Sequence, residues 1–256
     1  MKGFWAVYRK ELHSLFASPI FYVVAFIFLV ISGYFFYSAV AYFNLVSFQA
    51  GRNPAVLQQL NLSNMVLRPF FMDLTIVFLL VSPLLTMRLY AEERRSGTLE
   101  LLFTYPVTDR ATILAKFSAV VTVFLVVLVG TLPGFFLLEY LTDPSWKVIL
   151  CCYLGFFLLG SAFMAAGLFT SSLTRNQIIA AVLSFGILLM FWIISWMQSL
   201  AGPSLAGLIQ YLSIMEHFDT FSKGVIDSTD LLFYILFIAF FLFLTQRQIE
   251  SYRWRG

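Results

Sequence analysis

Six long apolar stretches follow one another along the chain, separated by shorter segments that hold most of the charges. They cover about residues 20–43, 71–89, 111–138, 147–170, 177–200 and 231–245. A helix needs about 20 mostly apolar residues to cross a lipid bilayer, so we expect one spanning helix from each stretch. The third contains Pro133 and Gly134 near its end. Because proline removes a backbone donor, we expect a kink or a re-entrant turn there.

The segment before the first stretch has a different pattern. Large apolar residues recur at helical spacing, and polar residues fall on the other faces; the apolar positions are Phe4, Tyr8, Leu12, Leu15 and Phe16. This pattern predicts an amphipathic elbow helix over residues 3–17 that lies at the membrane surface. Ser18 and Pro19 then turn the chain into the bilayer.

The composition excludes an ordinary soluble fold. Hydrophobic residues make up 61% of the chain and charged residues 11%, against about 45–50% and about 25% in soluble domains. In a bilayer the outer surface of a protein can be apolar. We therefore expect an all-α integral membrane protein in which residues 1–256 form a single transmembrane domain.

The distribution of lysine and arginine predicts the orientation. With six spans both termini share a side, and 12 of the 16 basic residues fall on that side; the other four are Arg52, Arg68, Lys147 and Lys223. Cytoplasmic loops carry the excess of basic residues in membrane proteins. We expect both termini and the loop around Arg94 to be cytoplasmic.

Residues 91–106, here called the coupling segment, form the most densely charged part of the chain. Charges of both signs alternate before Gly97, four large apolar residues follow, and Pro106 ends the run. A short helix of this kind can bind a groove on a cytoplasmic partner, with its apolar side chains giving affinity and its charges giving register.

The coupling segment resembles the coupling helix of ABC-2 type transporter permeases. The matching residues are Glu92, Glu93, Gly97, Thr98, Glu100 and Leu101, followed by Pro106-Val107 and, about ten residues on, Lys116. The resemblance implies the fold of type V exporters: six spans, an N-terminal elbow helix, and re-entrant external helices before the last span. It also implies that these six residues of the coupling segment bind the ATP-binding subunit.

A second motif lies in the external segment of residues 203–229, where we expect a half-buried pair of short helices. It consists of His217, Phe218, Asp219, Phe221, Gly224 and Asp227. The motif is similar to that of gliding-motility-associated permeases and of the permease linked to nitrous oxide reductase maturation. The resemblance implies an external gate or a segment that binds a partner.

The family resemblance also implies the partners. Two copies of an ABC ATPase subunit bind the cytoplasmic face, and a second permease completes a homodimer or a heterodimer. An extracytoplasmic or membrane-anchored accessory subunit can join. The first, second and fifth spans line the path or the dimer seam, and the resemblance implies a bacterial inner membrane. The chain has no Gly-x-x-x-x-Gly-Lys-Ser/Thr phosphate loop, so we expect ATP and Mg²⁺ to bind the partner subunit.

Several alternatives stay open at this stage. A channel or a membrane scaffold without ATP coupling is the main alternative, although a scaffold would not need the coupling segment. Ser213, His217 and Asp219 supply the residue types of a nucleophile, a base and an orienting acid. A proton-coupled carrier would place ionisable residues at mid-membrane depth, whereas Asp73 and Glu139 fall near the outer ends of their spans. No catalytic or metal site is expected, and neither the substrate nor the choice between export and force transmission follows from the sequence.

Overall fold

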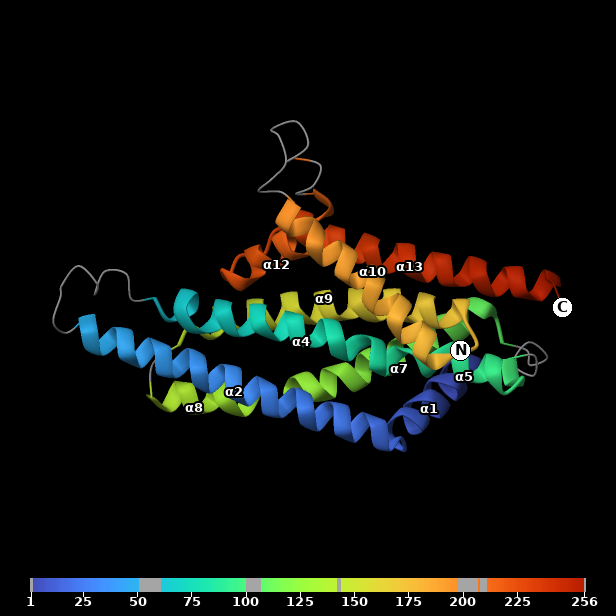
Figure 1. Cartoon of the computed structure of the whole chain (residues 1–256), viewed down its shortest axis with the longest axis horizontal. Helices are drawn as coiled ribbons and strands as arrows, with labels where there is room; N and C mark the ends of the chain where they lie inside the picture. Colours follow the sequence, from blue (N-terminus) through green and yellow to red (C-terminus); the bar gives the residue numbers. More distant parts are fainter. Residues whose placement is uncertain are drawn as a thin grey trace.

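The computed structural model describes residues 2–50, 61–99, 107–141, 144–197, 207 and 211–255. Every element in this described part of the chain is a helix. The elements are α1 (Lys2–Phe16), α2 (Pro19–Ala50), the short π-helix η1 (Ser63–Leu67), α4 (Arg68–Thr86), α5 (Arg88–Arg95), α7 (Asp109–Val129), α8 (Leu132–Leu141), α9 (Trp146–Leu173), α10 (Gln177–Met197), α12 (Ile214–Ser222) and α13 (Ser228–Arg255) (Figure 1).

Six helical stretches are long and apolar enough to cross a membrane. They are Pro19–Gln49, Ser63–Arg95, Asp109–Tyr140, Trp146–Leu173, Gln177–Ser195 and Ser228–Tyr252. The predicted all-α fold with six spanning helices is thereby confirmed. The second stretch reaches further than the apolar residues alone indicate, because Met87 keeps helical backbone angles (φ −52°, ψ −32°) and joins α4 to α5.

The long helices run side by side, so the molecule has two distinct ends (Figure 1). At one end lie α1 and α5, and α13 finishes there; we call it the α1 end. At the other lie the start of α4 and the short helix α12; we call it the α12 end. Of the external segment, residue 207 and residues 211–229 belong to the described part of the chain.

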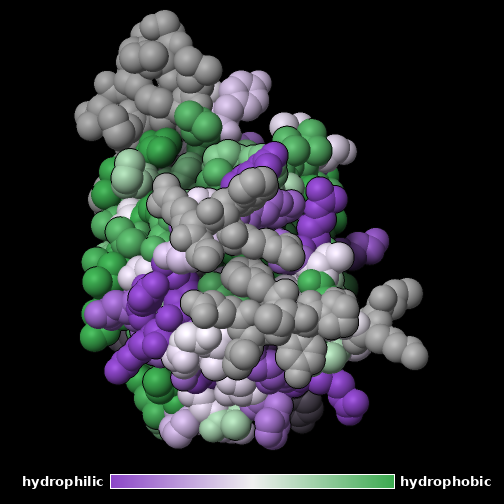
Figure 2. Space-filling model, turned by 90° about the vertical axis from the view of Figure 1, so that its right-hand side faces the viewer, coloured by the Kyte–Doolittle hydropathy of each residue, from purple (hydrophilic) through white to green (hydrophobic). Residues whose placement is uncertain are grey.

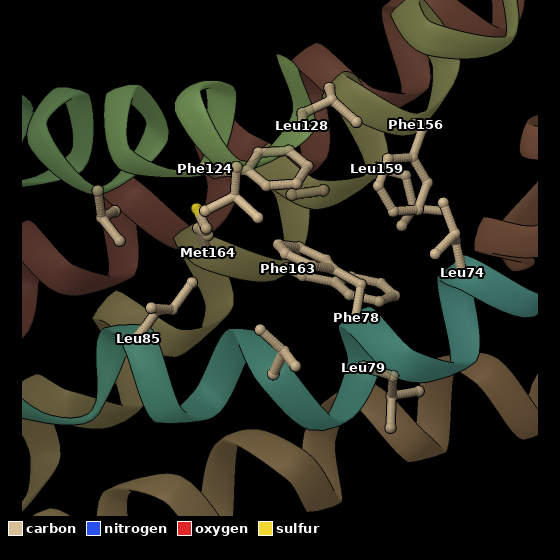
Figure 3. Packing of buried hydrophobic residues seen from close by; sticks show 14 of the residues in the cluster. Leu74, Phe78, Leu79, Leu85, Phe124, Leu128, Phe156, Leu159, Phe163 and Met164 are labelled. Carbon is tan, nitrogen blue, oxygen red and sulfur yellow. The ribbon is translucent and has the colours of Figure 1, made fainter. Parts of the chain in front are cut away.

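Helix α9 forms the centre of the bundle, because its small residues admit bulky neighbours. A Cβ atom on Gly160 would lie 2.4 Å from the Phe124 ring, and one on Gly167 would lie 2.1 Å from the Thr86 hydroxyl. Phe78 and Phe124 pack beside Gly160, with ring centroids 4.3 Å apart (Figure 3). Small residues allow helices in membranes to approach closely.

The third spanning stretch is broken between α7 and α8. Helix α7 ends at Val129, and Thr131 lies in the break, where its hydroxyl is 2.7 Å from both the Leu128 carbonyl oxygen and the Tyr153 hydroxyl. The predicted irregularity is therefore present, slightly before Pro133. Proline occupies the first turn of α8, where a missing N–H costs no hydrogen bond.

Burial differs sharply among the spanning helices. In the most apolar part of each helix, 72% of the residues are buried in α9, but only 22% in α2 and 17% in α10. Helices α2 and α10 therefore present broad apolar faces to the surroundings of this chain.

Candidate functional site

Helix α1 is attached to the bundle by contacts with α7 and α5. The Tyr8 hydroxyl lies 3.0 Å from the Thr122 hydroxyl on α7. At the end of α1, Arg88 donates hydrogen bonds of 3.1 and 3.4 Å to the carbonyl oxygens of Ser14 and Leu15. These carbonyls lack partners within their own helix, so Arg88 attaches the end of α1 to the start of α5.

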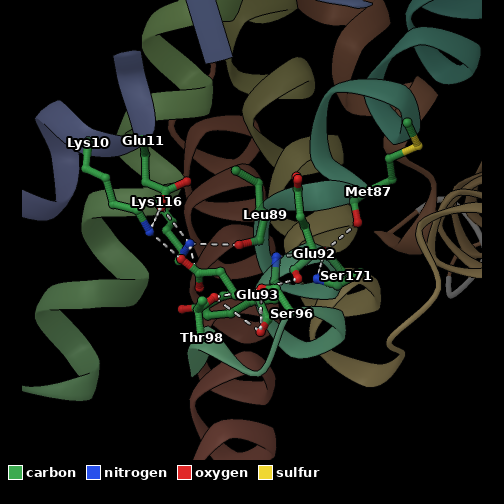
Figure 4. A network of polar contacts seen from close by, with 12 residues as sticks. Lys10, Glu11, Met87, Leu89, Glu92, Glu93, Ser96, Thr98, Lys116 and Ser171 are labelled. Carbon is green, nitrogen blue, oxygen red and sulfur yellow. Dashed lines mark hydrogen bonds and ion pairs between the residues drawn. The ribbon is translucent and has the colours of Figure 1, made fainter. Parts of the chain in front are cut away.

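A buried ion network joins α1, α5 and α7 (Figure 4). The Lys116 ammonium of α7 is fully buried and lies 2.9 Å from Glu11 Oε1 and 3.0 Å from Glu93 Oε2. It also donates a 2.7 Å hydrogen bond to the Leu89 carbonyl oxygen. Lys116 therefore donates hydrogen bonds to Glu11 and Leu89 and forms an additional charge contact with Glu93. We call Lys10, Glu11, Glu93 and Lys116 the lysine network.

The charges of the lysine network balance. Lys10 lies at the surface, and its ammonium is 2.6 Å from Glu93 Oε1. Two carboxylates therefore face two ammonium groups. Burial alone lowers the pKa of Lys10, but its hydrogen bond and charge contact with Glu93 outweigh this effect and raise that pKa. A buried charge is tolerated when it is paired and hydrogen-bonded, and here both conditions hold.

Helix α5 is also attached to α9 and α13. The Ser171 hydroxyl of α9 accepts hydrogen bonds from the backbone N–H groups of Tyr90 (3.0 Å) and Ala91 (3.1 Å). It donates to the Met87 carbonyl oxygen at 2.8 Å. Arg94 donates to the Ser172 carbonyl oxygen and lies 3.9 Å from the centre of the Tyr252 ring. These contacts bridge the α4–α5 junction and restrict the movement of α5 relative to the bundle.

The chain turns directly after α5. Gly97 has a φ of +71°, a backbone conformation that glycine adopts without steric cost. The Ser96 hydroxyl supports the turn, because it donates to the Glu92 carbonyl oxygen at 2.9 Å and lies 2.9 Å from the Thr98 hydroxyl. The turn forms an exposed tip at the α1 end, a face on which hydrophilic side chains gather (Figure 2).

The structure separates the predicted docking residues into two groups. Glu92, Gly97 and Thr98 are exposed at the tip, whereas Glu93 is buried and turned into the lysine network. Glu100 and Leu101 lie outside the described residues. The sequence reasoning singled out neither Glu11 nor Lys10. The sequence feature that could have indicated this network is Lys116, because a lone lysine in an apolar stretch needs a buried acid as its partner.

Helix α12 closes the opposite end with a second set of ion pairs. Asp219 lies 2.6 Å from Arg68 at the start of α4 and 2.5 Å from Lys223. Burial alone raises the pKa of Asp219, but the hydrogen bonds from Lys223 and Arg68 outweigh it and lower that pKa below its usual value. Asp219 therefore holds α12 against α4 in its charged form.

The other residues of the external motif pack α12 inward. His217 Nδ1 lies 2.6 Å from Asp230 Oδ1 of α13, and its ring stacks on Phe233. Phe218 and Phe221 are buried, and Gly155 of α9 leaves room for Phe221. Two further motif positions lie in the turn after α12: Gly224 has a φ of +80°, and Asp227 is exposed.

The arrangement does not form a catalytic triad. His217 pairs with Asp230 rather than Asp219, and Asp219 binds Arg68. The Ser213 hydroxyl instead caps α12 by accepting a 3.3 Å hydrogen bond from the Glu216 N–H. Within the described residues, no group of three or more His, Cys, Asp or Glu side chains is placed to hold a metal ion.

Comparison with known proteins assigns the chain to a family. None of the curated proteins matches it. The family described as ABC-2 family transporter protein matches residues 5–246, which is nearly the whole chain. Members of this family supply the membrane-spanning component of an ATP-binding-cassette transporter, and the ATPase is a separate subunit. The chain therefore belongs to the ABC-2 transporter family, as a multi-pass membrane permease component.

Proposed function

We propose that the tip after α5 receives the movement of an ABC ATPase subunit and passes it into the bundle, so that ATP hydrolysis drives export or force transmission. The observation that carries this proposal is the lysine network. It ties the helix that bears the exposed tip to α1 and α7 through buried charges. A displacement of α5 therefore moves three segments together, because breaking the pairs would leave charges unpaired in the interior.

The α4–α5 helix supplies a route across the molecule. The stretch Ser63–Arg95 has 33 residues, which corresponds to a length of about 50 Å at 1.5 Å per residue. Its α12 end bears Arg68, the partner of Asp219. A tilt that starts at the tip would change the position of α12 through this ion pair.

A cleft beside the tip provides a receptor for side chains of the ATPase subunit. Its volume is about 210 Å³, and its lining includes Lys10, Ser14, Arg88, Glu92, Ser96 and Thr98. Basic and acidic groups face the same cleft, so an ATPase loop with charges of both signs would match it. In this proposal Glu92, Gly97, Thr98, Glu100 and Leu101 bind the ATPase, and Glu93 positions α5.

The proposal extends to the assembly and its orientation. Two ATPase subunits bind the α1 end in the cytoplasm, where both termini lie, and a second permease, identical or homologous, packs against α2 and α10. The basic residues of the sequence support this orientation. The α12 end then faces outward as a gate or as the binding site of an accessory subunit. The motif of residues 217–227 supports the subgroup of gliding-motility and nitrous-oxide-reductase-maturation permeases, in a bacterial inner membrane.

The test is purification of the tagged chain from its native membrane in mild detergent, with mass spectrometry and an ATPase assay of the eluate. We expect an ABC ATPase subunit to co-elute, and Glu100→Lys or Leu101→Asp to remove it while membrane insertion persists. His217→Ala combined with Asp227→Ala should alter transport or outer partner binding but keep the ATPase bound. If the chain elutes alone without ATPase activity, it acts as a channel or a scaffold and the proposal is wrong.

A further inference from the structure

One face of α4 carries a carboxylate among apolar residues. Asp73 recurs at helical spacing with Ile76, Leu80 and Leu84, whose side chains are 46%, 56% and 40% exposed. Asp73 itself is partly exposed. These four residues therefore form one outward-facing stripe along α4, which we call the α4 stripe.

The α4 stripe lies between two helices that are themselves mostly uncovered. Helix α4 packs against both α2 and α10 (Figure 1). Ring contacts between Phe28 and Phe78 and between Phe36 and Phe70, with centroids 6.0 and 5.7 Å apart, set the register of α2 against α4. In this register Gly33 is level with Asp73.

Asp73 lies within the second spanning stretch, Ser63–Arg95, towards the α12 end. It follows Arg68 by five residues, or about 7.5 Å along a helix, and Arg68 already belongs to the ion pairs of the α12 end. Among the described residues, no hydrogen bond or ion pair joins Asp73 to another side chain. An unpaired carboxylate against lipid is costly, and such residues face a water-filled cavity or a ligand instead.

Neither of the two helices that flank the α4 stripe carries an ionisable group that could compete for this role. Helices α2 and α10 contain no Asp, Glu, Lys, Arg or His. A proton relay needs a chain of titratable groups, and the described faces of these helices do not supply one. A single carboxylate above an apolar stripe is instead suited to an organic cation with an apolar body.

We propose that Asp73 binds the positively charged group of the transported molecule, in a water-filled path lined by the α4 stripe and its flanking helices. The substrate class is then an amine or another organic cation with a largely apolar body, whose body lies along Ile76, Leu80 and Leu84. This inference rests on the proposed transport function and adds the substrate class to it.

The first experiment tests whether Asp73 faces water. Cys151 and Cys152 are buried, and they are replaced by Ala to give a cysteine-free background. Asp73→Cys should react in membranes with the membrane-impermeant reagent 2-(trimethylammonium)ethyl methanethiosulfonate. The matched control is Phe240→Cys on α13, a position 55% exposed that we assign to lipid and that should stay unlabelled. If both cysteines are equally unreactive, the Asp73 proposal is wrong whatever the fate of the ATPase coupling.

The second experiment tests charge recognition in the permease–ATPase complex in liposomes. Tetraphenylphosphonium should stimulate the ATPase, whereas the anion tetraphenylborate, of the same shape, should not. Asp73→Asn should raise the half-maximal concentration of the cation about tenfold or more, the effect of losing one charged contact, and Asp73→Glu should restore it. A wild-type complex without ATPase activity would count against the proposed function instead. The role of Asp73 would be overturned if the cation did not stimulate the ATPase of an active complex, or if the cation and the anion stimulated it equally. It would also be overturned if Asp73→Asn responded to the cation as the wild type does.

Discussion

Glu11 on α1 and Lys116 on α7 form an ion pair of 2.9 Å although 105 residues separate them in the chain. The lysine has no exposed surface, and the glutamate side chain is only 8% exposed. The pair fixes the surface helix α1 to the bundle at the level of α5. It gives α1 a defined place beside the tip, where the proposed ATPase contact lies.

Lys116→Met should destabilise the protein strongly. The substitution removes a buried cation and leaves Glu11 with only its 3.3 Å contact to the largely exposed Lys10. Breaking a buried ion pair costs about 3–5 kcal/mol. Thermal unfolding in detergent measures the loss, and ATPase coupling in the complex should fall with it.

Lys10→Met is the matched control for this prediction. Lys10 also contacts Glu93, but the Lys10 side chain is 58% exposed. Exposed ion pairs contribute about 0–1 kcal/mol. Equal destabilisation by the two substitutions would contradict the special role of the buried lysine.

Gly167→Ala should be destabilising because α9 has no room at that position. A Cβ atom there would lie 2.8 Å from Thr86 Cβ as well as against its hydroxyl, and overpacking of this kind costs about 1–3 kcal/mol. Gly186→Ala on α10 is the control, since no atom lies within 4 Å of its added Cβ. Unfolding temperatures should fall for the first variant and hold or rise slightly for the second. The reverse order would argue against α9 as the central helix.

The attachment of α12 should depend on pH through Asp219. The pKa of this carboxyl is lowered in the folded protein, so its stabilising effect is complete above the ordinary value of 3.8. The effect is lost as the pH falls through the lowered pKa. Hydrogen exchange of α12 between pH 7 and pH 3 should show protection that declines only at the acid end. In Asp219→Asn the protection of α12 should not change between pH 7 and pH 3. If it declines by the same amount as in the wild type, Asp219 is not the cause of the decline.

The fold was predictable because its signals are local. An apolar stretch identifies its own helix. The spacing of Tyr8, Leu12 and Leu15 predicted a helix over residues 3–17, where the structure has α1 (Lys2–Phe16). The helix ends were harder to predict. Charged residues such as Arg88 and Arg95 continue the second helix beyond its apolar part, and α13 continues to Arg255 in the same way. Hydropathy cannot show where a helix stops once it has left the apolar region.

The candidate site was only partly predictable for a different reason. Glu92, Gly97 and Thr98 belong to one short motif, and the sequence placed them together. The partner of Lys116 depends on how α1 packs across α7, and no spacing rule relates Glu11 to Lys116. Glu93 was predicted to bind the ATPase because it matches the coupling-helix motif together with Glu92. Adjacent residues on a helix point about 100° apart, so Glu92 is exposed and Glu93 is buried.

The most direct measurement is photo-crosslinking from the tip to the ATPase subunit in native membranes. A benzoylphenylalanine in place of Thr98, which is exposed beside the proposed cleft, should form an adduct with an ABC ATPase subunit on irradiation. The same group in place of Asp227, exposed in the turn after α12, should form none with that subunit. An adduct from Asp227 and none from Thr98 would contradict the proposal that the tip after α5 is where ATP hydrolysis acts on this permease.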